Sequence, residues 1–430
     1  MIDRVGFWVA RDLWPVLRVA KLGRDRLDAL ARKRLTRMLR TAVTLPFYRQ
    51  RLDTAGVGDD ELMMELCPEE VLRALAPVTK AELREAGGDV LLGGRVLPDW
   101  RSSSSSGSTG EPFRVYYEPR AWATLKILVK LRARSACGIR PSDRVALLDA
   151  VPPSESTLGA AGRVARISIL QPAARVAAEL AAFAPDTIYG LPSALLEAGQ
   201  ELRYRGARLR VRRIFTSGEL LRPAVRQAIA GAFGAPVYDV YGSSETKEIA
   251  WECPAGGMHI NADVVRVEVL DEANRPVPRG VEGNLVASLL VNHAMPLLRY
   301  RIGDRGSLLA ESCACGHPFP LLGVVTGRRA DMLVLEGGHR VSPYALTCAM
   351  ERVGDVLRYQ VTQLDPARLR VRAILDGVAD RAQVAGRIRS VIRHEVAPFL
   401  ETEVEFVDRL PRGPRAKFRV VEPLASLEIA

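Results

Sequence analysis

The feature that most constrains the fold is an alternation of strand-like and helix-like segments between residues 144 and 245. Short apolar runs such as RVALLDA, DTIYGLP and VRRIFTSGE are each followed by a segment with helical spacing, for example AARVAAELAAFAP. The rhythm continues to YDVYGSSE at residues 238–245. Alternation of this kind favours a largely parallel sheet with helices on its faces. The predicted fold class is therefore α/β.

The flanking parts of the chain have different patterns. Residues 1–60 repeat apolar residues at helical spacing, and Thr79 followed by Glu82 predicts the start of another helix. Residues 264–290 resemble antiparallel strands with Pro/Gly turns. We expect a helix from about Arg120 to Cys137 and, from about residue 327 onward, a small α+β domain. That domain is predicted to contain a hairpin, strands near 356–363 and 367–376, and helices near 343–353 and 378–396.

These patterns predict two domains. The first, residues 1–327, combines the helical segment 1–60, the parallel sheet and a β-rich subdomain. The second, residues 328–430, is a mobile C-terminal α+β domain with a pivot near Arg329–Asp331. The length of 430 residues fits this division.

Charge and hydropathy narrow the class of protein. The chain has 61 Lys and Arg against 50 Asp and Glu, a net charge of +11, but no aromatic-and-basic nucleic-acid module. A basic enzyme with anionic small substrates fits this balance, and no nucleic-acid partner is expected. No long apolar run predicts a transmembrane span, and the N-terminus lacks the pattern of a signal peptide, so we expect a cytoplasmic location.

The first 40 residues are basic and amphipathic, with Trp8 and Trp14 among them. Two interpretations stay open for this segment: a helix packed on its own domain, or association with a membrane surface.

The serine-rich stretch RSSSSSGSTGEPFRVYY at residues 101–117 allows two interpretations. Gly/Ser runs are often flexible linkers. This one instead lies inside the βα region and precedes a strand-like run, and Gly107 and Gly110 allow positive φ. Backbone N–H groups and hydroxyls in such a loop bind phosphate. The absence of a following Gly-Lys-Ser/Thr argues against a P-loop NTPase.

Five motifs in order resemble the superfamily of adenylate-forming enzymes, which includes acyl-CoA synthetases and adenylation domains. They are SSGSTGEP, YDVYGSSET, LLRYRIGDRG, GRRADMLVLEGGHRVSP and LPRGPRAKFRVV. Within the superfamily, LPFYRQRLDTAGV, LAPVTKAELRE and FAPDTIYGLPSALLEAGQEL are similar to the phenylacetate–CoA ligase branch. The resemblance covers the whole chain. It implies that a carboxylate attacks ATP to give an acyl-adenylate, and that a thiol, typically coenzyme A, then displaces AMP.

The resemblance implies a role for particular residues. The ATP-binding positions would be Ser104, Ser105, Ser106, Gly107, Ser108, Thr109, Gly110, Ser217, Gly218, Glu219, Tyr241, Gly242, Ser243, Ser244, Asp304 and Arg328. Asp304 would accept hydrogen bonds from the ribose, with a buried pair of Arg301 and Asp304 as the structural alternative. Glu245 would hold Mg²⁺, with an N-capping carboxylate as the alternative. Glu245, Arg328 and Lys417 would be the catalytic residues, and Lys417 would bridge the substrate carboxylate and the nucleotide during adenylation.

Two positions depart from the family pattern. Glu111 stands where the branch usually has a lysine, which makes the loop less positive; Arg114 is a nearby compensating charge. Lys417 follows the spacing GPRAK rather than an adjacent Gly-Lys, and an exposed lysine in a basic tail is the alternative interpretation.

A metal site is predicted from two short loops. Cys253 and His259 lie in ECPAGGMH, and Cys313 and Cys315 lie in ESCACGHP. Four such ligands match a structural Cys₃His zinc site, with His317 as a competing ligand and reduced, unliganded cysteines as the alternative. The chain has only six cysteines, so a disulfide framework is not expected.

Three functions remain in competition at this stage. The leading one is an AMP-forming ligase of coenzyme A and an aromatic or other small carboxylic acid. The second is an adenylating enzyme that passes its acyl group to a carrier protein or an amine. The third is an inactive nucleotide-binding scaffold, which Glu111 and the spacing before Lys417 keep open. The identity of the acid has no motif, and a homodimer is left open.

Overall fold

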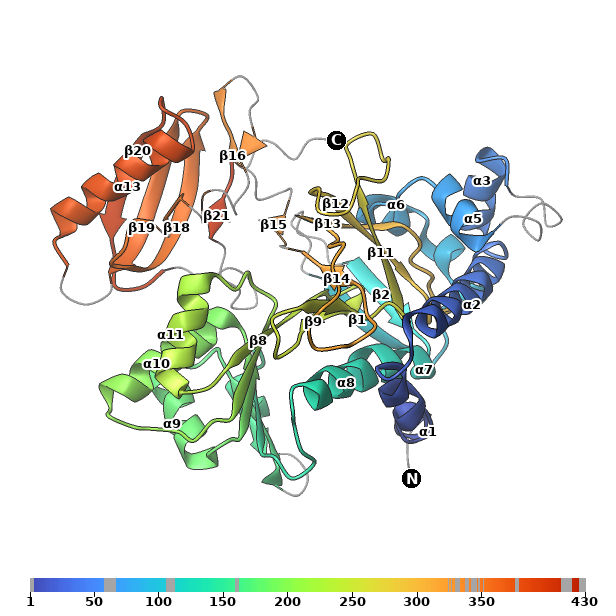
Figure 1. Ribbon diagram of the computed structural model, residues 1–430, viewed down its shortest axis with the longest axis horizontal. Helices are drawn as coiled ribbons and strands as arrows, with labels where there is room; N and C mark the ends of the chain where they lie inside the picture. The colour runs from blue at the N-terminus through green and yellow to red at the C-terminus, as the bar shows by residue number, and fades with distance from the viewer. Residues whose placement is uncertain are drawn as a thin grey trace. The chain divides into compact units, whose positions relative to one another are not determined.

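The computed structural model describes most of the chain (Figure 1). The described residues are 4–57, 67–105, 113–158, 162–323, 325, 327–328, 333–336, 340–341, 346, 349–350, 352–375, 379–410 and 420–424. Contacts within the chain group it into two compact units, the first of residues 1–139 and 240–325 and the second of residues 140–239 and 326–430. Each unit is described separately below. Within the described residues, no helix is long and apolar enough to cross a membrane.

The first unit begins with helices, as the spacing of apolar residues predicts. They are α1 (Arg4–Val19), α2 (Arg24–Ala42), α3 (Pro46–Thr54), α5 (Pro68–Ala74) and α6 (Lys80–Glu85), followed by the short helices η1 (Gly87–Val90) and η2 (Leu92–Gly94). The predicted capping box is confirmed at α6. The Thr79 hydroxyl accepts a hydrogen bond from the Glu82 N–H, and the Glu82 carboxylate accepts one from the Thr79 N–H at 2.7 Å.

The serine-rich stretch is partly a strand rather than a loop. β1 (Arg101–Ser105) pairs antiparallel with β2 (Phe113–Tyr117), so Ser104 lies opposite Arg114. Phe113, Val115 and Tyr117 alternate inward with the period of a half-buried strand, which explains why this segment folds as a hairpin. The predicted helix from Arg120 follows as α7 (Pro119–Trp122), the π-helical η3 (Ala123–Leu128) and α8 (Val129–Ala136).

Antiparallel strands form the rest of the first unit. β8 (Val237–Ser243) enters it from the second unit and pairs antiparallel with β9 (Lys247–Glu252), which in turn pairs with β10 (Met258–Ile260) and, beyond it, β14 (Leu321–Leu322). A second sheet is formed by β11 (Val265–Leu270), β12 (Gly283–Leu289) and β13 (Tyr300–Gly306). The antiparallel β region expected for residues 264–290 is confirmed.

The second unit contains the parallel sheet. β3 (Val145–Asp149) pairs in parallel with both β5 (Val164–Ser168) and β6 (Thr187–Gly190), and β6 pairs in parallel with β7 (Arg213–Ser217). The helices α9 (Ala173–Phe183), α10 (Pro192–Tyr204) and α11 (Pro223–Phe233) alternate with these strands and bury their apolar faces in a common core. Short elements η4 (Pro153–Glu155) and β4 (Thr157–Leu158) precede β5. The predicted alternation and the α/β class are confirmed.

The C-terminal part of the second unit is an α+β layer with its own core. β18 (Val356–Asp365) and β19 (Arg368–Leu375) form an antiparallel pair, with β20 (Glu401–Phe406) parallel to β19 and β21 (Val421–Glu422) parallel to β18. Helix α13 (Arg381–Glu395) packs against β20.

Both predicted strands and the second predicted helix of this part are therefore confirmed. So is the hairpin, as β16 (Leu333–Val334) paired with β17 (Arg340–Val341), after the short β15 (Gly327–Arg328).

Two expectations for this part stay open. Most of the helix expected near 343–353 lies outside the described residues. The division of the chain at 327/328 stays a prediction, because the two compact units also separate at residues 139/140 and 239/240, inside the predicted first domain.

Candidate active site and metal centre

The predicted magnesium ligand lies in a tight turn between two strands. Ser244, Glu245 and Thr246 connect β8 to β9, and the Ser243 hydroxyl accepts hydrogen bonds from the N–H groups of Glu245 at 3.2 Å and Thr246 at 3.1 Å. A Cβ on Gly242 would lie 2.1 Å from the Lys247 carbonyl oxygen, so the close pairing of the two strands requires glycine there. A strand rather than a helix follows Glu245, which excludes its interpretation as an N-capping carboxylate.

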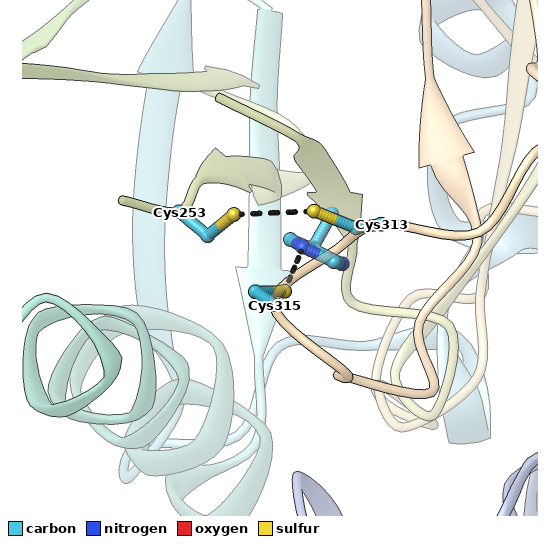
Figure 2. Close-up of side chains that lie close together, drawn as sticks. Cys253, Cys313 and Cys315 are labelled. Carbon is cyan, nitrogen blue, oxygen red and sulfur yellow. Dashed lines mark hydrogen bonds between the residues drawn. The ribbon is translucent and has the colours of Figure 1, made fainter. Parts of the chain in front are cut away.

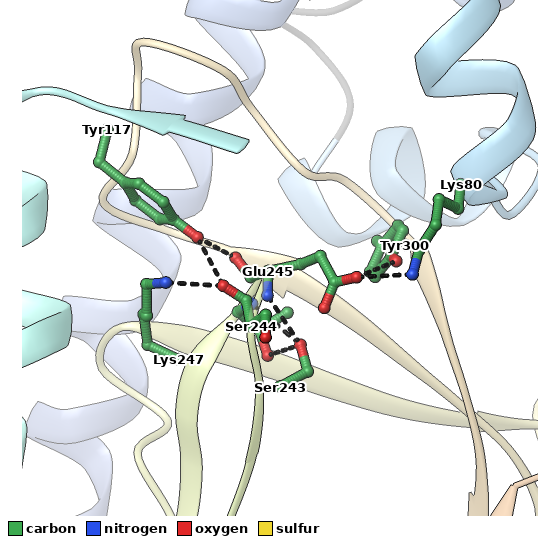
Figure 3. A network of polar contacts seen from close by, with 8 residues as sticks. Lys80, Tyr117, Ser243, Ser244, Glu245, Lys247 and Tyr300 are labelled. Carbon is green, nitrogen blue, oxygen red and sulfur yellow. Dashed lines mark hydrogen bonds and ion pairs between the residues drawn. The ribbon is translucent and has the colours of Figure 1, made fainter. Parts of the chain in front are cut away.

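The Glu245 side chain is only 7% exposed and is held by two partners from distant parts of the chain (Figure 3). Its Oε1 lies 2.8 Å from the Lys80 ammonium, and it accepts a hydrogen bond from the Tyr300 hydroxyl at 3.3 Å. Burial alone would raise the pKa of Glu245, but the charge and the hydrogen bond of Lys80 outweigh burial and lower it. The carboxylate is therefore ionised at neutral pH and suited to bind a hard cation.

The opposite side of the turn is held by two further side chains. The Tyr117 hydroxyl donates to the carbonyl oxygens of Glu245 and, at 3.3 Å, Ser244 (Figure 3). The Lys247 ammonium donates to the Ser244 carbonyl at 2.6 Å and lies over the rings of Tyr117 and Trp122. Burial, with the nearby charge of Lys126, lowers the pKa of Lys247 to about 7.

The predicted ribose-binding residue is oriented by a tyrosine. The Tyr241 hydroxyl donates to Asp304 Oδ2 at 2.8 Å, which joins the end of β8 to β13. Arg301 donates to the side-chain oxygen of Asn274. The alternative of an Arg301–Asp304 pair is therefore not what the structure forms. Gly303, immediately before Asp304, has φ of 92°, a conformation that favours glycine.

The remaining predicted nucleotide residues divide between the two units. Ser104 and Ser105 belong to β1, whereas Ser106, Gly107, Ser108, Thr109, Gly110 and Glu111 lie outside the described residues. In the second unit, Ser217 ends β7 and Gly218 follows it. Glu219 accepts hydrogen bonds from the N–H and hydroxyl of Ser193, each at 2.9 Å. Arg328 is in β15, and Lys417 lies outside the described residues.

The predicted metal ligands come together in the first unit (Figure 2). One ligand atom each from Cys253, His259, Cys313 and Cys315 lies within 4.8 Å of the others. The sulfurs of Cys253 and Cys313 are 3.5 Å apart, and the Cys315 sulfur is 3.1 Å from His259 Nε2. His317 is outside this set, and its ring packs edge-on against that of His259 at a centroid distance of 5.6 Å.

The local backbone is built for close approach of these side chains. A Cβ on Gly257 would lie 2.6 Å from the Cys313 sulfur, and Gly256 and Gly316 adopt positive φ in the two ligand loops. A tetrahedral zinc with Zn–S bonds of ~2.3 Å places two sulfurs about 3.8 Å apart, close to the observed spacing. The four residues therefore fit a Cys₃His zinc site.

Burial shifts the pKa values of two of the four residues in opposite directions. Burial lowers the pKa of His259 to about 4, so its imidazole is neutral and able to ligate at neutral pH. Burial, together with thiol contacts to Cys313 and Cys253, raises the pKa of Cys315 to about 12. A bound divalent cation would lower the pKa of Cys315 again, because a cation stabilises neighbouring thiolates.

Reasoning from sequence missed the residues that support Glu245. Lys80 lies in LAPVTKAELRE and Tyr117 in FRVYY, and Lys247 directly follows YDVYGSSET, but none of the three has a predicted role. Their contacts to the turn span up to 165 residues, as for Lys80 and Glu245, and periodicity carries no information about such pairs.

Comparisons with known proteins show the family of this chain. The family described as "AMP-binding enzyme" matches residues 105–289. A phenylacetate–coenzyme A ligase of Thermus thermophilus is 30% identical over 373 residues, covering 81% of this chain and 82% of that protein. The Escherichia coli phenylacetate–coenzyme A ligase is 29% identical over 334 residues, and this match covers 73% of this chain and 74% of that protein. A 2-hydroxyisobutyryl-CoA ligase structure shares the fold, with a TM-score of 0.76, 22% identity, and coverage of 95% and 92%.

Proposed function

This chain belongs to the adenylate-forming superfamily, in its phenylacetate–CoA ligase-like branch, and we propose that the turn carrying Glu245 is the centre of its acid-activating site. The enzyme is an AMP-forming acid–CoA ligase: it adenylates a carboxylic acid with ATP and then forms the thioester with coenzyme A. The observation that carries the assignment of the site is the buried, ionised Glu245 carboxylate at the end of the Tyr-Gly-x-x-Glu motif.

The polar groups around the turn suit the first half-reaction. Glu245 would hold Mg²⁺, which supplies positive charge at the phosphates of ATP when it is bound. Lys80 keeps the carboxylate ionised in its absence, and the Ser243 hydroxyl fixes the turn that presents it. Asp304, oriented by Tyr241, would accept hydrogen bonds from the ribose hydroxyls.

Other residues are assigned from their motifs. The hairpin end at Ser104 and Ser105, continued by residues 106–110, would surround the β- and γ-phosphates. Ser217, Gly218 and Glu219 would line the nucleotide, although Glu219 already accepts two hydrogen bonds from Ser193. Arg328 would face the ribose.

The Cys/His cluster would hold a structural zinc ion. Its four ligands would leave no open coordination position, so the metal would tie the loops at Cys253 and Cys313 together without taking part in the reaction.

A panel of carboxylic acids tests the activity and its acceptor. Purified enzyme would be incubated with ATP, Mg²⁺ and each acid, with and without coenzyme A, and the products identified by mass spectrometry. We expect an acyl-CoA and AMP for at least one aromatic or small acid. An acid-dependent release of pyrophosphate that coenzyme A does not accelerate would instead favour transfer to a carrier protein or an amine.

Tyr241→Phe removes the hydroxyl that orients Asp304. We expect the KM for ATP in the adenylation step to rise about 3–10-fold, with a smaller change in kcat, because a hydrogen bond to a charged group is lost in the nucleotide site. Steady-state pyrophosphate release measures both constants. The exposed Tyr204→Phe serves as control, and an unchanged KM for ATP in Tyr241→Phe would contradict the role of this pair.

Lys417→Ala separates the two half-reactions. We expect adenylation to fall about 10²-fold or more, because a positive charge at the reacting carboxylate is lost, while thioester formation from a supplied acyl-adenylate stays near the wild-type rate. Single-turnover assays of each half-reaction measure this ratio. Equal loss in both steps would show that Lys417 acts in some other way.

A further inference from the structure

The outward face of helix α1 carries two large aromatic side chains among arginines. Phe7 is 53% exposed and Trp14 is 67% exposed. They are two helical turns apart, so they lie on the same face of the helix, together with exposed Arg4, Arg11 and Arg18. An exposed pair of this size is unusual for a side of a helix that faces only water.

The opposite face of α1 is already packed. Val5, Asp12 and Val16 are buried there, and the Asp12 carboxylate accepts a hydrogen bond from Arg120 Nε at 2.7 Å. The helix contacts α7 and η3 through this face. Phe7 and Trp14 are therefore not part of the core that holds α1 in place. They lie on the exposed face of a helix whose other face is packed against the rest of the unit.

A second apolar segment lies beside the start of α1. Leu92, Val96 and Leu97 are 38–43% exposed, and Asp99, just after them, forms an ion pair with Arg4. A cavity of about 220 Å³ lies between the start of the helix and the residues that follow this segment, and is lined by Arg4, Val5, Pro98, Asp99, Trp100, Arg101 and Pro119. Five of the ten large hydrophobic side chains that are exposed among the described residues therefore belong to these two segments.

The basic charge of the N-terminal segment favours an anionic partner. The first 40 residues contain eleven Lys and Arg against four Asp and Glu, a formal net charge of +7. Three of these arginines, Arg4, Arg32 and Arg34, form ion pairs with acids outside the segment, and the remaining excess of positive charge is still +4. Basic charge beside exposed Trp and Phe matches an anionic lipid surface, where arginines bind headgroups and aromatic rings lie at the interface. A second copy of the chain would bring two such positive segments together, which is unfavourable.

We propose that the outward face of α1, with the neighbouring segment 92–97, binds the surface of an anionic membrane. The binding would be peripheral and would not depend on the acid-activating site.

Vesicle sedimentation of the full-length protein tests this proposal. The protein would be mixed with vesicles of phosphatidylcholine alone or of phosphatidylcholine with phosphatidylserine, over a series of salt concentrations. We expect binding to the anionic vesicles, weakening with salt, and a loss of affinity of about tenfold or more in Phe7→Ser/Trp14→Ser. Tyr204→Ser is the matched control, because Tyr204 is 89% exposed on α10, in the second unit.

Three results would overturn the proposal. The first is a lack of binding to anionic vesicles, or equal binding to neutral ones. The second is unchanged affinity in the double variant, whose melting temperature should match that of the wild type because both side chains are exposed. The third is a lipid-free dimer, seen by sedimentation velocity, that the double variant converts to a monomer, since this would make a second copy the partner.

Discussion

Glu245→Gln is expected to lower kcat/KM for adenylation by about 10²–10³-fold, as for the loss of one electrostatic contact to a transition state. The substitution keeps the size of the side chain but removes the negative charge that would hold Mg²⁺. It also leaves the Lys80 ammonium, 2.8 Å away, without its ionised partner. Acid-dependent release of pyrophosphate, measured over a series of Mg²⁺ concentrations, should show the loss and a weaker response to the metal.

Glu268→Gln is the matched control for this experiment. Glu268 is a largely buried carboxylate in the same unit, 3.3 Å from Arg299, and it lies on β11 outside the proposed site. Its variant should keep adenylation close to the wild-type rate even if its melting temperature falls. If the Glu245 variant were as active as this control, Glu245 would not be a metal-binding or catalytic residue.

Cys315→Ser is expected to release the metal and to destabilise the first unit. The purified wild type should contain about one equivalent of zinc, and the variant much less, because a hydroxyl is a poor substitute for a thiolate. We expect the melting temperature to fall by about 10 °C or more, since each kcal/mol corresponds to about 2–4 °C in a domain of 150–250 residues. Metal analysis and calorimetry of the same samples give both values.

Cys67→Ser separates loss of metal from loss of any cysteine. Cys67 precedes α5 as its N-cap, away from the cluster, and serine is itself a favourable N-cap residue. Its zinc content and melting temperature should stay at the wild-type values. A wild-type protein that is folded but contains less than about 0.3 equivalents of zinc would contradict a structural site.

Local patterns were sufficient where the structure follows from one segment at a time. The strands at residues 145–149, 187–190 and 213–217 and their intervening helices could be predicted because apolar spacing distinguishes the two kinds of element. The Cys/His cluster could also be predicted, because two short loops carry all four ligands. In each case the information lies within a few neighbouring residues.

Features that depend on how segments pair in the folded chain could not be predicted in this way. The serines at 102–105 form a strand because they pair with the apolar segment 113–117, although their composition suggests a loop. The roles of Lys80 and Lys247 depend on their contacts with the turn at Glu245. These contacts form only when the chain is folded. The close approach at Gly242 likewise appears only when β8 and β9 pair.

The most direct test of the account is acid-dependent exchange of labelled pyrophosphate into ATP. This exchange reports reversible formation of an acyl-adenylate and requires no assumption about the acceptor. We predict exchange by the wild-type enzyme with at least one aromatic or small carboxylic acid, and a reduction of about 10²-fold or more in Glu245→Gln. Exchange that is absent with every acid tested, or that is equal in the two proteins, would contradict the proposed site.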